Sequence, residues 1–246
     1  MSLSRFDKNN YEFNTSSKLG IYILHGFSGT TYEVKELAEF LGTNGYHTIA
    51  NNLPGHGTNI EDCNRIKYQD WIDKVKQDVA ELSSKCDKVF VIGNSMGGVL
   101  SLYLASLFPL NGFVAAGTVL KFQNHFTIKY VVPFVSYFMP SRIKNKVTKA
   151  VQYYGYEKYP LKALNQFRKM NTKIIPLIKK IKVPGMLIHS NSDTLSIKEN
   201  ITIIKDNMTD KSIKTLYVEK AHHNMFDKNP DQKLIFNEVL QFLNSH

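Results

Sequence analysis

The chain has little of several residue types that mark particular classes of protein. Its 2 cysteines, Cys63 and Cys86, stand in no CxxC or metal-ligand spacing, so the sequence indicates neither a disulfide framework nor a zinc module. Its 14 glycines and 8 prolines are too few for a fibrous protein, and the sequence contains no internal repeat. These absences leave an ordinary globular protein with free thiols.

Long apolar runs are also absent. No uninterrupted apolar stretch reaches the ~20 residues that a helix needs to cross a bilayer. The residues from Met1 to Lys8 are polar and lack the apolar segment of a secretory signal peptide. Because the thiols are also expected to be free, we expect a cytoplasmic protein.

The positive charge of the chain is concentrated in one segment. The 246 residues, of which 43% are hydrophobic and 21% charged, are enough to bury a sizeable core. Residues 121–182 hold 14 lysines or arginines and a single acid, Glu157, whereas the rest of the chain has 17 basic and 20 acidic residues. The net charge of +10 therefore arises in this segment, which indicates an inserted unit with its own surface properties.

Short apolar runs alternate with amphipathic stretches on both sides of the basic segment. Predicted strands cover residues 18–24, 47–50, 88–92, 112–116, 185–189 and 213–218, and predicted helices cover residues 34–41, 71–82, 96–107, 197–208 and 231–243. Nearly continuous apolar strands that alternate with helices are typical of a parallel sheet covered on both faces. The sequence therefore predicts the α/β class.

This alternation is interrupted between residues 119 and 180. The stretch is basic, aromatic and irregular, and it holds four of the 8 prolines. We interpret it as a small, mostly helical cap insertion on the sheet rather than as an independent domain. The predicted core then comprises residues 1–118 and 181–246.

A serine surrounded by glycines follows the third predicted strand. The stretch Gly93-Asn-Ser-Met-Gly97 has the pattern G-x-S-x-G between a strand and a helix, which is the context of a nucleophile elbow. Such a turn is sharp and strained, so small neighbours let the backbone pass close to adjacent elements. The alternative is a glycine-rich turn in which Ser95 only caps the helix.

A second loop favours the nucleophile interpretation. His25-Gly-Phe-Ser-Gly29 follows the first predicted strand, and in hydrolases of this architecture such a loop supplies one backbone N–H of the oxyanion hole. We assign that donor to Phe27 and the second donor to Met96, the residue after the nucleophile. His25 is expected to fix the loop rather than to act as a base.

A serine hydroxyl is a weak nucleophile at neutral pH, so Ser95 needs a base and a residue that orients the base. In this architecture the order along the chain is serine, acid, histidine, and the last two follow late strands. Asp193 follows the fifth predicted strand, and His222 and His223 follow the sixth. Order and strand position agree with a catalytic triad, although only one of the two adjacent histidines can face Ser95.

These stretches together resemble bacterial carboxylesterases and monoacylglycerol lipases of the α/β-hydrolase fold. The resemblance runs from about Gly20 to the C-terminus and is weakest in the insertion. It rests on HGFSG at 25–29, LPGHGT at 53–58, GNSMGG at 93–98, SNSD at 190–193 and AHHNMFD at 221–227. It implies Ser95 as nucleophile, Asp193 as orienting acid and a helical cap over the active site.

The resemblance also implies a choice between the two histidines. In these proteins the catalytic histidine stands five places before an aspartate, and His222 has this relation to Asp227. His222 is therefore the expected base. Asn94 stands where these proteins often carry an apolar residue.

The expected activity is hydrolysis of carboxylic esters with short-to-medium acyl chains through an acyl-enzyme intermediate. This chemistry requires neither a metal nor an organic cofactor. The same residues also allow a monoacylglycerol lipase or lysophospholipase, and a thioesterase or acyltransferase, because the fold alone does not separate these chemistries. A non-catalytic protein that binds a small ligand is the alternative outside enzymes.

The expected partner is a small-molecule ester, and the sequence contains no recognised nucleic-acid-binding module. The aromatic stretch over residues 130–139 is flanked by lysines. It could form the roof of an acyl pocket, or it could rest the basic insertion weakly on an anionic lipid surface. The remaining alternative is an ordinary cap helix with a solvated, lysine-rich outer face.

Overall fold

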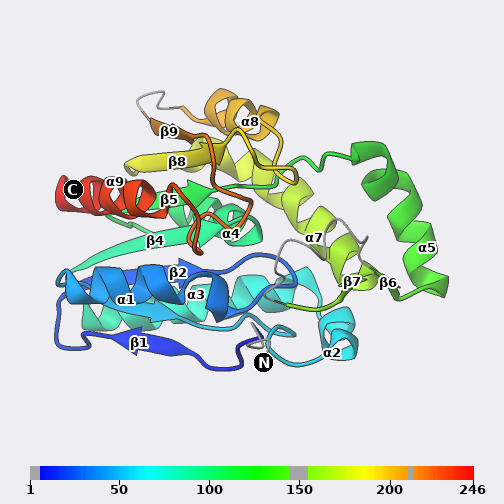
Figure 1. Cartoon of the computed structure of the whole chain (residues 1–246), viewed down its shortest axis with the longest axis horizontal. Coiled ribbons are helices and arrows are strands. Elements are labelled where there is room, and N and C mark those ends of the chain that lie inside the picture. The colour runs from blue at the N-terminus through cyan, green and yellow to red at the C-terminus, as the bar shows by residue number, and fades with distance from the viewer. Residues whose placement is uncertain (1–5, 144–154, 210–212) are drawn as a thin grey trace.

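A seven-stranded sheet forms the centre of the computed structural model, which describes residues 6–143, 155–209 and 213–246. In sheet order the strands are β1 (Tyr11–Phe13), β3 (His47–Ala50), β2 (Leu19–Leu24), β4 (Lys88–Asn94), β5 (Gly112–Ala116), β8 (Gly185–Ser190) and β9 (Lys214–Val218). β1 pairs with β3 in antiparallel orientation, and the other neighbouring pairs are parallel. The mostly parallel α/β sheet predicted from the sequence is therefore confirmed (Figure 1).

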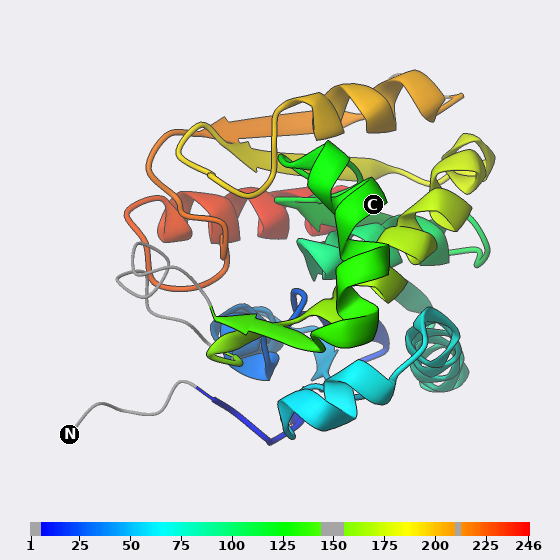
Figure 2. The same cartoon turned by 90° about the vertical axis from the view of Figure 1, so that its right-hand side faces the viewer.

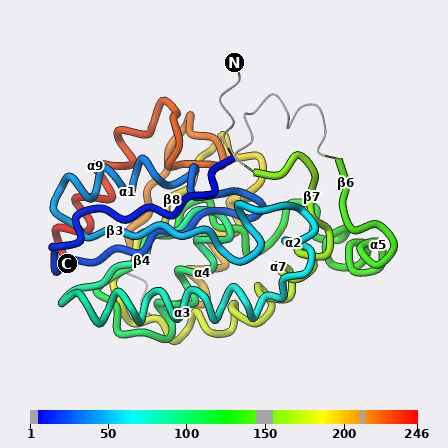
Figure 3. The backbone as a smooth tube through the Cα atoms, turned by 90° about the horizontal axis from the view of Figure 1, so that it is seen from below, coloured from blue at the N-terminus to red at the C-terminus, as the bar shows by residue number. Residues whose placement is uncertain are grey.

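Helices cover both faces of this sheet. They are α1 (Lys35–Thr43) and α9 (Gln232–Asn244) on one face, and α3 (Tyr68–Lys85), α4 (Met96–Ala105), α7 (Leu161–Ile174) and α8 (Glu199–Asn207) on the other. Seen from below, α1 and α9 lie on one side of the strands and α3 on the opposite side (Figure 3). The predicted helices are all present, with ends that differ by a few residues.

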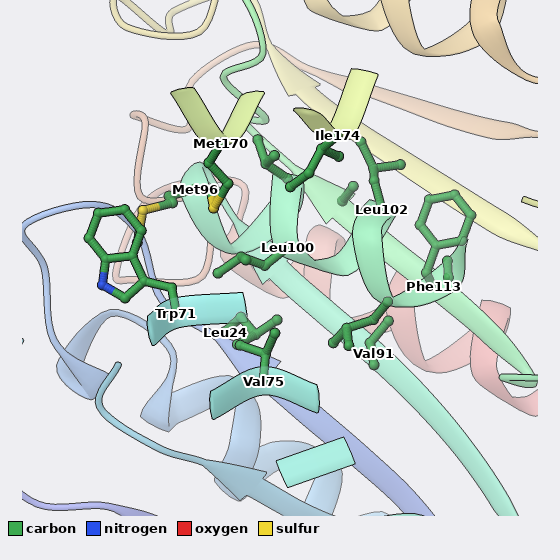
Figure 4. Close-up of a cluster of buried hydrophobic side chains, with 14 of the residues drawn as sticks. Leu24, Trp71, Val75, Val91, Met96, Leu100, Leu102, Phe113, Met170 and Ile174 are labelled. Atoms are coloured by element: carbon green, nitrogen blue, oxygen red, sulfur yellow. The ribbon is translucent and has the colours of Figure 1, made fainter. Parts of the chain in front are cut away.

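The two faces hold separate hydrophobic clusters because successive side chains of a strand point to opposite faces. In β2, Ile21 and Ile23 belong to the cluster under α1 and α9, whereas Tyr22 and Leu24 belong to the cluster under α3 and α4. Figure 4 shows the second cluster, in which Trp71 of α3 lies near Met96 of α4. Ser95 directly precedes Met96, so this core supports the base of the predicted elbow.

The basic insertion divides into two parts. Helix α7 and the turn η3 (Ile175–Lys180) bury Phe167, Met170 and Ile178 in the cluster shared with α3 and α4. The other part contains η2 (Thr127–Val131), α5 (Val132–Phe138) and the antiparallel pair β6 (Ser141–Ile143) and β7 (Lys158–Pro160). This part stands off the sheet at one end of the molecule (Figures 1 and 2). We infer that, among the described residues, the cap comprises residues 119–143 and 155–160 and that α7 serves as a core helix.

Three short elements within residues 11–65 were not predicted from the sequence. They are β1, the turn η1 (Thr31–Glu33) and α2 (Ile60–Arg65). Each has six residues or fewer, which is too short to show a hydrophobic period. In the described part of the chain, no helix combines the length and the apolar character needed to cross a membrane.

Candidate active site

The turn that carries Ser95 is strained, and its glycines are required by packing. Ser95 has φ 57° and ψ −112°, a backbone conformation with positive φ that residues other than glycine rarely adopt. A Cβ on Gly93 would overlap the carbonyl oxygen of Gly97, and a Cβ on Gly97 would overlap the carbonyl oxygen of Leu24 in β2. The glycines therefore let α4 begin directly against the neighbouring strands, which exposes Ser95 at the end of β4.

Ser95, His223 and Asp193 form one hydrogen-bonded chain. The Ser95 Oγ lies 2.8 Å from His223 Nε2, and His223 Nδ1 lies 2.8 and 3.0 Å from the two carboxylate oxygens of Asp193. The Asp193 side chain is fully buried, and its Oδ1 also accepts the N–H groups of Leu195 and Ser196. The structure thus brings together a hydroxyl, an imidazole and a carboxylate in the geometry of a nucleophile, a base and an orienting acid.

The expectation that His222 faces Ser95 is wrong. His222 is exposed, and His223 makes the contacts with Ser95 and Asp193. The loop is fixed on both sides of this pair: the carbonyl of Ala221 accepts the Ser190 hydroxyl, and Met225 is fully buried. With Ala221 directed into the core, the next side chain points outward and the one after it points inward. The separation from Asp227 is therefore four residues, not five.

The charges of Asp193 and His223 favour the ionised pair. Burial raises the pKa of Asp193, but the charge and hydrogen bond of His223, with two backbone N–H donors, outweigh it and hold the pKa below its usual value. Burial lowers the pKa of His223, but the charge and hydrogen bond of Asp193, helped by Glu33, leave this pKa above its usual value. The arrangement therefore stabilises an imidazolium at position 223.

The loop after β2 lies beside Ser95 and is held by two buried histidines. Nε2 of His25 accepts the N–H of Leu53, so Nδ1 carries the proton and donates to the carbonyl of Gly26 at 2.8 Å. Nε2 of His56 accepts the N–H of Ser28 at 3.1 Å. Burial lowers the pKa of His25 to about 4 and that of His56 to about 3, so both rings are neutral at pH 7. His25 has the loop-fixing contacts expected from the sequence.

The two predicted oxyanion donors are the N–H groups of Phe27, in the loop after β2, and Met96, at the start of α4. The peptide N–H groups flanking Phe27 are used within the protein, because Gly26 donates to Glu33 and Ser28 donates to His56. Within the described ranges, the N–H groups of Phe27 and Met96 have no protein acceptor. Both groups are therefore available to a ligand, and their role in an oxyanion hole stays a prediction.

A cavity of about 520 Å³ contains Ser95 and His223. Most of its wall comes from the cap and α7, and the aliphatic and phenylalanine side chains there are Val119, Phe122, Ile128, Val132, Ile143, Leu161, Leu164 and Phe167. Its polar lining residues include Glu33, Gln123, Asn124, Arg142 and Asn224. A cavity with apolar walls and several polar groups suits an acyl chain attached to a polar alcohol.

Two residues near the site were not assigned a contact from the sequence. The Asn94 Oδ1 accepts the N–H of Met225 at 3.4 Å, which links the elbow to the loop that carries His223. The Glu33 carboxylate is buried against the loop after β2 and lines the cavity. Asn94 occupies a variable position of the G-x-S-x-G stretch and Glu33 lies outside the recognised motifs, so only the fold reveals these contacts.

The sequence of the chain is similar to the sequences of known hydrolases. Residues 15–230 match the family described as Hydrolase_4, serine aminopeptidase, S33. The chain is 29% identical over 232 residues to the thermostable monoacylglycerol lipase of Bacillus sp. (strain H-257), covering 93% of this chain and 91% of that protein. It is 25% identical over 228 residues to a carboxylesterase of Bacillus subtilis (strain 168), covering 91% of each.

Solved structures show the same fold. A structure from a study of LipS and LipT, two metagenome-derived lipolytic enzymes, superposes with a TM-score of 0.86 at 22% identity and covers 97% of this chain and 98% of that one. The monoacylglycerol lipase of Paleococcus ferrophilus superposes with a TM-score of 0.78 at 18% identity, with 97% and 98% covered. The chain belongs to the Hydrolase_4 family of serine hydrolases and has the α/β-hydrolase fold.

Proposed function

We propose that this serine hydrolase cleaves carboxylic esters through an acyl-enzyme intermediate, and that its preferred substrates are monoacylglycerols. The observation that carries the proposal is the chain from Ser95 through His223 to Asp193, which opens into an apolar cavity under the cap. The matches to a monoacylglycerol lipase and a carboxylesterase support esters as the substrate class. Simple carboxylic esters, expected from the sequence, are the second candidate.

The proposed reaction has two halves. His223 Nε2 takes the Ser95 proton while Ser95 Oγ attacks the ester carbonyl carbon, and the N–H groups of Phe27 and Met96 bind the resulting oxyanion. The imidazolium then gives its proton to the alcohol oxygen, which leaves. Water next gives a proton to His223 and attacks the acyl carbon, and the acid departs as Ser95 regains its proton. Asp193 keeps the His223 Nδ1–H oriented throughout.

The apolar part of the cavity predicts a dependence on acyl-chain length. Each methylene buried in an apolar site contributes about 0.8 kcal/mol, or about fourfold in kcat/KM, until the cavity is filled. We therefore expect kcat/KM for p-nitrophenyl esters to rise from acetate to medium chains and then to fall. Medium-chain monoacylglycerols are expected to be hydrolysed at least as well as the p-nitrophenyl ester of the same acid.

The decisive experiment compares this ester series with monoacylglycerols, for the wild-type protein and Ser95→Ala. The variant should lose at least about 10³-fold in kcat on every substrate because its nucleophile is gone. Good turnover of p-nitrophenyl acetate without monoacylglycerol hydrolysis would assign a simple carboxylesterase instead. Equal activity of Ser95→Ala and the wild-type protein would refute the triad.

We also propose that the outer face of the cap rests on an anionic lipid surface that presents the substrate. In α5, Val132 and Ser136 are buried, whereas Phe134, Tyr137 and Phe138 on the opposite face are 69%, 80% and 71% exposed. Phe126, Tyr130 and Met139 extend the exposed apolar surface. We call these six side chains the aromatic face. Such a contiguous patch on a monomer is typical of an interaction surface.

Charge selects the partner of the aromatic face. The exposed cations Lys129 and Arg142 lie in the same part of the cap, and residues 121–182 contain a single acid. Aromatic side chains surrounded by cations favour the boundary of an anionic bilayer. Because the same segment also lines the cavity, a docked cap would place the cavity close to its lipid substrate.

Co-sedimentation with vesicles tests this contact. The wild-type protein should bind phosphatidylglycerol-containing vesicles at low salt and bind less with added salt, because screening weakens the charge term. The double variant Phe134→Ser/Phe138→Ser should bind less and keep its p-nitrophenyl butyrate activity. Leu107→Ser, which changes an exposed apolar residue outside the cap, is the matched control. Absence of vesicle binding, or a dimer that the double variant abolishes, would overturn the proposal.

A further inference from the structure

Glu33 is a buried carboxylate beside the active site that the proposed reaction does not use. It ends the turn η1 and is 6% exposed, although it lines the same cavity as Ser95 and His223. Its Oε2 accepts the N–H of Gly26 at 2.8 Å. A buried carboxylate is costly unless hydrogen bonds compensate it, so these contacts define where the loop and the carboxylate must lie.

Hydrogen bonds hold both peptide groups of Gly26 in place. Its N–H donates to Glu33, and its carbonyl accepts the His25 Nδ1–H at 2.8 Å and the Gly29 N–H at 3.3 Å. The Gly26 carbonyl and the Phe27 N–H belong to one planar peptide, so a bond that fixes the first also fixes the direction of the second. The anchors on Gly26 therefore determine where the Phe27 N–H points.

Glu33 also sets the separation between this loop and the nucleophile. A Cβ on Gly26 would lie 3.1 Å from Glu33 Oε2 and 3.3 Å from Ser95 Cβ, so the Gly26 backbone lies between the two side chains. A Cβ on Gly29 would overlap the Glu33 carboxylate, which shows that the loop closes around it. Removing the carboxylate would leave space into which the loop could move away from Ser95.

The charge of Glu33 acts on His223 as well. The titratable groups that face the His223 ring are Asp193 from the loop after β8, Glu33 from η1 and His189 from β8. Asp193 makes the larger contribution in raising the His223 pKa, and Glu33 adds to it in the same direction. Both carboxylates therefore favour the imidazolium that forms when Ser95 attacks the ester.

We propose that Glu33 is a positioning residue of this enzyme, which holds the loop over residues 26–29 so that the Phe27 N–H faces the oxyanion, and which stabilises protonated His223 by its charge. The proposal rests on the proposed ester hydrolysis by Ser95 and His223. It assigns a purpose to a buried acid that lies outside the serine, histidine and aspartate triad.

Two substitutions separate the two effects. Glu33→Ala removes both the acceptor and the charge, and kcat for p-nitrophenyl butyrate should fall about 10- to 100-fold, somewhat less than the ~10²- to 10³-fold that follows loss of an oxyanion donor. KM should change by less than about threefold, because the oxyanion forms only in the transition state. Glu33→Gln keeps an acceptor oxygen for the Gly26 N–H and should restore most of kcat.

The pH profile of kcat/KM gives a readout that a merely structural residue would not move. Loss of the Glu33 charge lowers the His223 pKa, so the acid limb of Glu33→Gln should shift to lower pH by several tenths of a unit. Glu36→Ala, which changes a half-buried acid three residues away with partners in α9 and its preceding loop, should leave both kcat and the acid limb unchanged.

The outcomes are distinguishable. Wild-type kcat in Glu33→Ala, or an unmoved acid limb in Glu33→Gln, would overturn the positioning role. If Glu33→Ala does not fold, as judged from its melting curve, the acid limb of Glu33→Gln decides alone. Failure of the proposed function is a different result, since the wild-type protein would then hydrolyse none of the esters and Ser95→Ala would match it.

Discussion

Two adjacent histidines differ completely in their surroundings, because consecutive side chains of the loop after β9 point in opposite directions. His223 lies between the Ser95 hydroxyl and the Asp193 carboxylate, and His222 is exposed to solvent. The expected spacing of five residues before Asp227 selects His222. In this chain the histidine that faces Ser95 stands only four residues before Asp227, so the spacing selects the wrong neighbour. The buried neighbours Ala221 and Met225 decide the orientation.

Substitution of each histidine tests this placement. His223→Ala should lower kcat for p-nitrophenyl butyrate by at least about 10³-fold, because Ser95 loses its base. His222→Ala should keep more than half of the wild-type kcat, because its side chain contacts no reacting group. Melting curves of both variants control for folding. Loss of activity in His222→Ala with full activity in His223→Ala would contradict the geometry.

Among the elements, the turn between β4 and α4 is the most constrained. An added methyl on Gly97 would overlap the carbonyl oxygen of Leu24 in β2, a backbone atom that the centre of the sheet holds in place. Gly98 is less constrained, because the atom closest to an added Cβ is the side-chain hydroxyl of Thr118 rather than a backbone atom. The two neighbouring glycines therefore offer a matched pair.

We predict that Gly97→Ala destabilises the protein by about 3 kcal/mol, the upper end for overpacking, and lowers kcat by at least tenfold through displacement of Ser95. Gly98→Ala should cost about 1 kcal/mol, because a side chain can yield where a backbone cannot. Urea unfolding and p-nitrophenyl butyrate kinetics measure both quantities. Equal effects of the two substitutions would show that the backbone contact at Gly97 does not set the position of the elbow.

The sequence predicts elements and sites with different success, for physical reasons. The core strands are found because continuous apolar runs have few alternative structures, whereas β1 and α2 are too short to carry a period. The sequence places α7 in the insertion because residues 119–180 as a whole are basic, aromatic and irregular, whereas Phe167 and Met170 on its buried face pack on the core. Composition counts the residues on the exposed and buried faces of a helix together, so it does not show which face packs on the core.

Within the site, residues that belong to a motif are predictable and supporting residues are not. Ser95 and Asp193 follow from their positions after strands, and the structure joins them through one histidine. Asn94 contacts Met225 in a segment far away in the sequence, and Glu33 contacts Gly26 seven residues before it, but neither contact is marked by a recognised sequence pattern. Only tertiary packing brings the elbow against Met225, and only the folded turn η1 directs the Glu33 carboxylate back to Gly26.

At the scale of the whole molecule, the active site lies where two differently charged parts meet. Outside residues 121–182 the chain carries a slight excess of acids, and the segment from 121 to 182 carries all the excess of cations. Ser95 and His223 come from the core, whereas most of the apolar wall of the cavity comes from the cap and α7. If the proposed function holds, the reacting groups and most of the substrate-binding wall are contributed by different parts of the chain.

The buried histidines beside the active site make the stability of the fold sensitive to acid. The pKa of His25 is about 4 and that of His56 about 3, against about 6.5 for a histidine in an unfolded chain. Between pH 6.5 and 4 the unfolded chain therefore binds protons that the folded protein does not, and the free energy of unfolding falls as the pH falls. Above pH 6.5 this contribution is fully present.

We predict that the lowered pKa of His25 alone decreases the free energy of unfolding by about 3 kcal/mol between pH 6.5 and 4, since each unit of pKa difference between the folded and unfolded chain corresponds to about 1.4 kcal/mol. Urea unfolding at pH 7.0, 5.5 and 4.5 measures the loss. His56→Gln keeps an acceptor for the Ser28 N–H but loses the imidazole ring and its titration. The variant should therefore be less stable than the wild-type protein at pH 7 and lose less stability on acidification. The exposed His222→Gln is the control and should follow the wild-type curve. An unchanged pH dependence in His56→Gln would mean that acid unfolds the molecule through its carboxylates rather than through the loop that holds the Phe27 N–H.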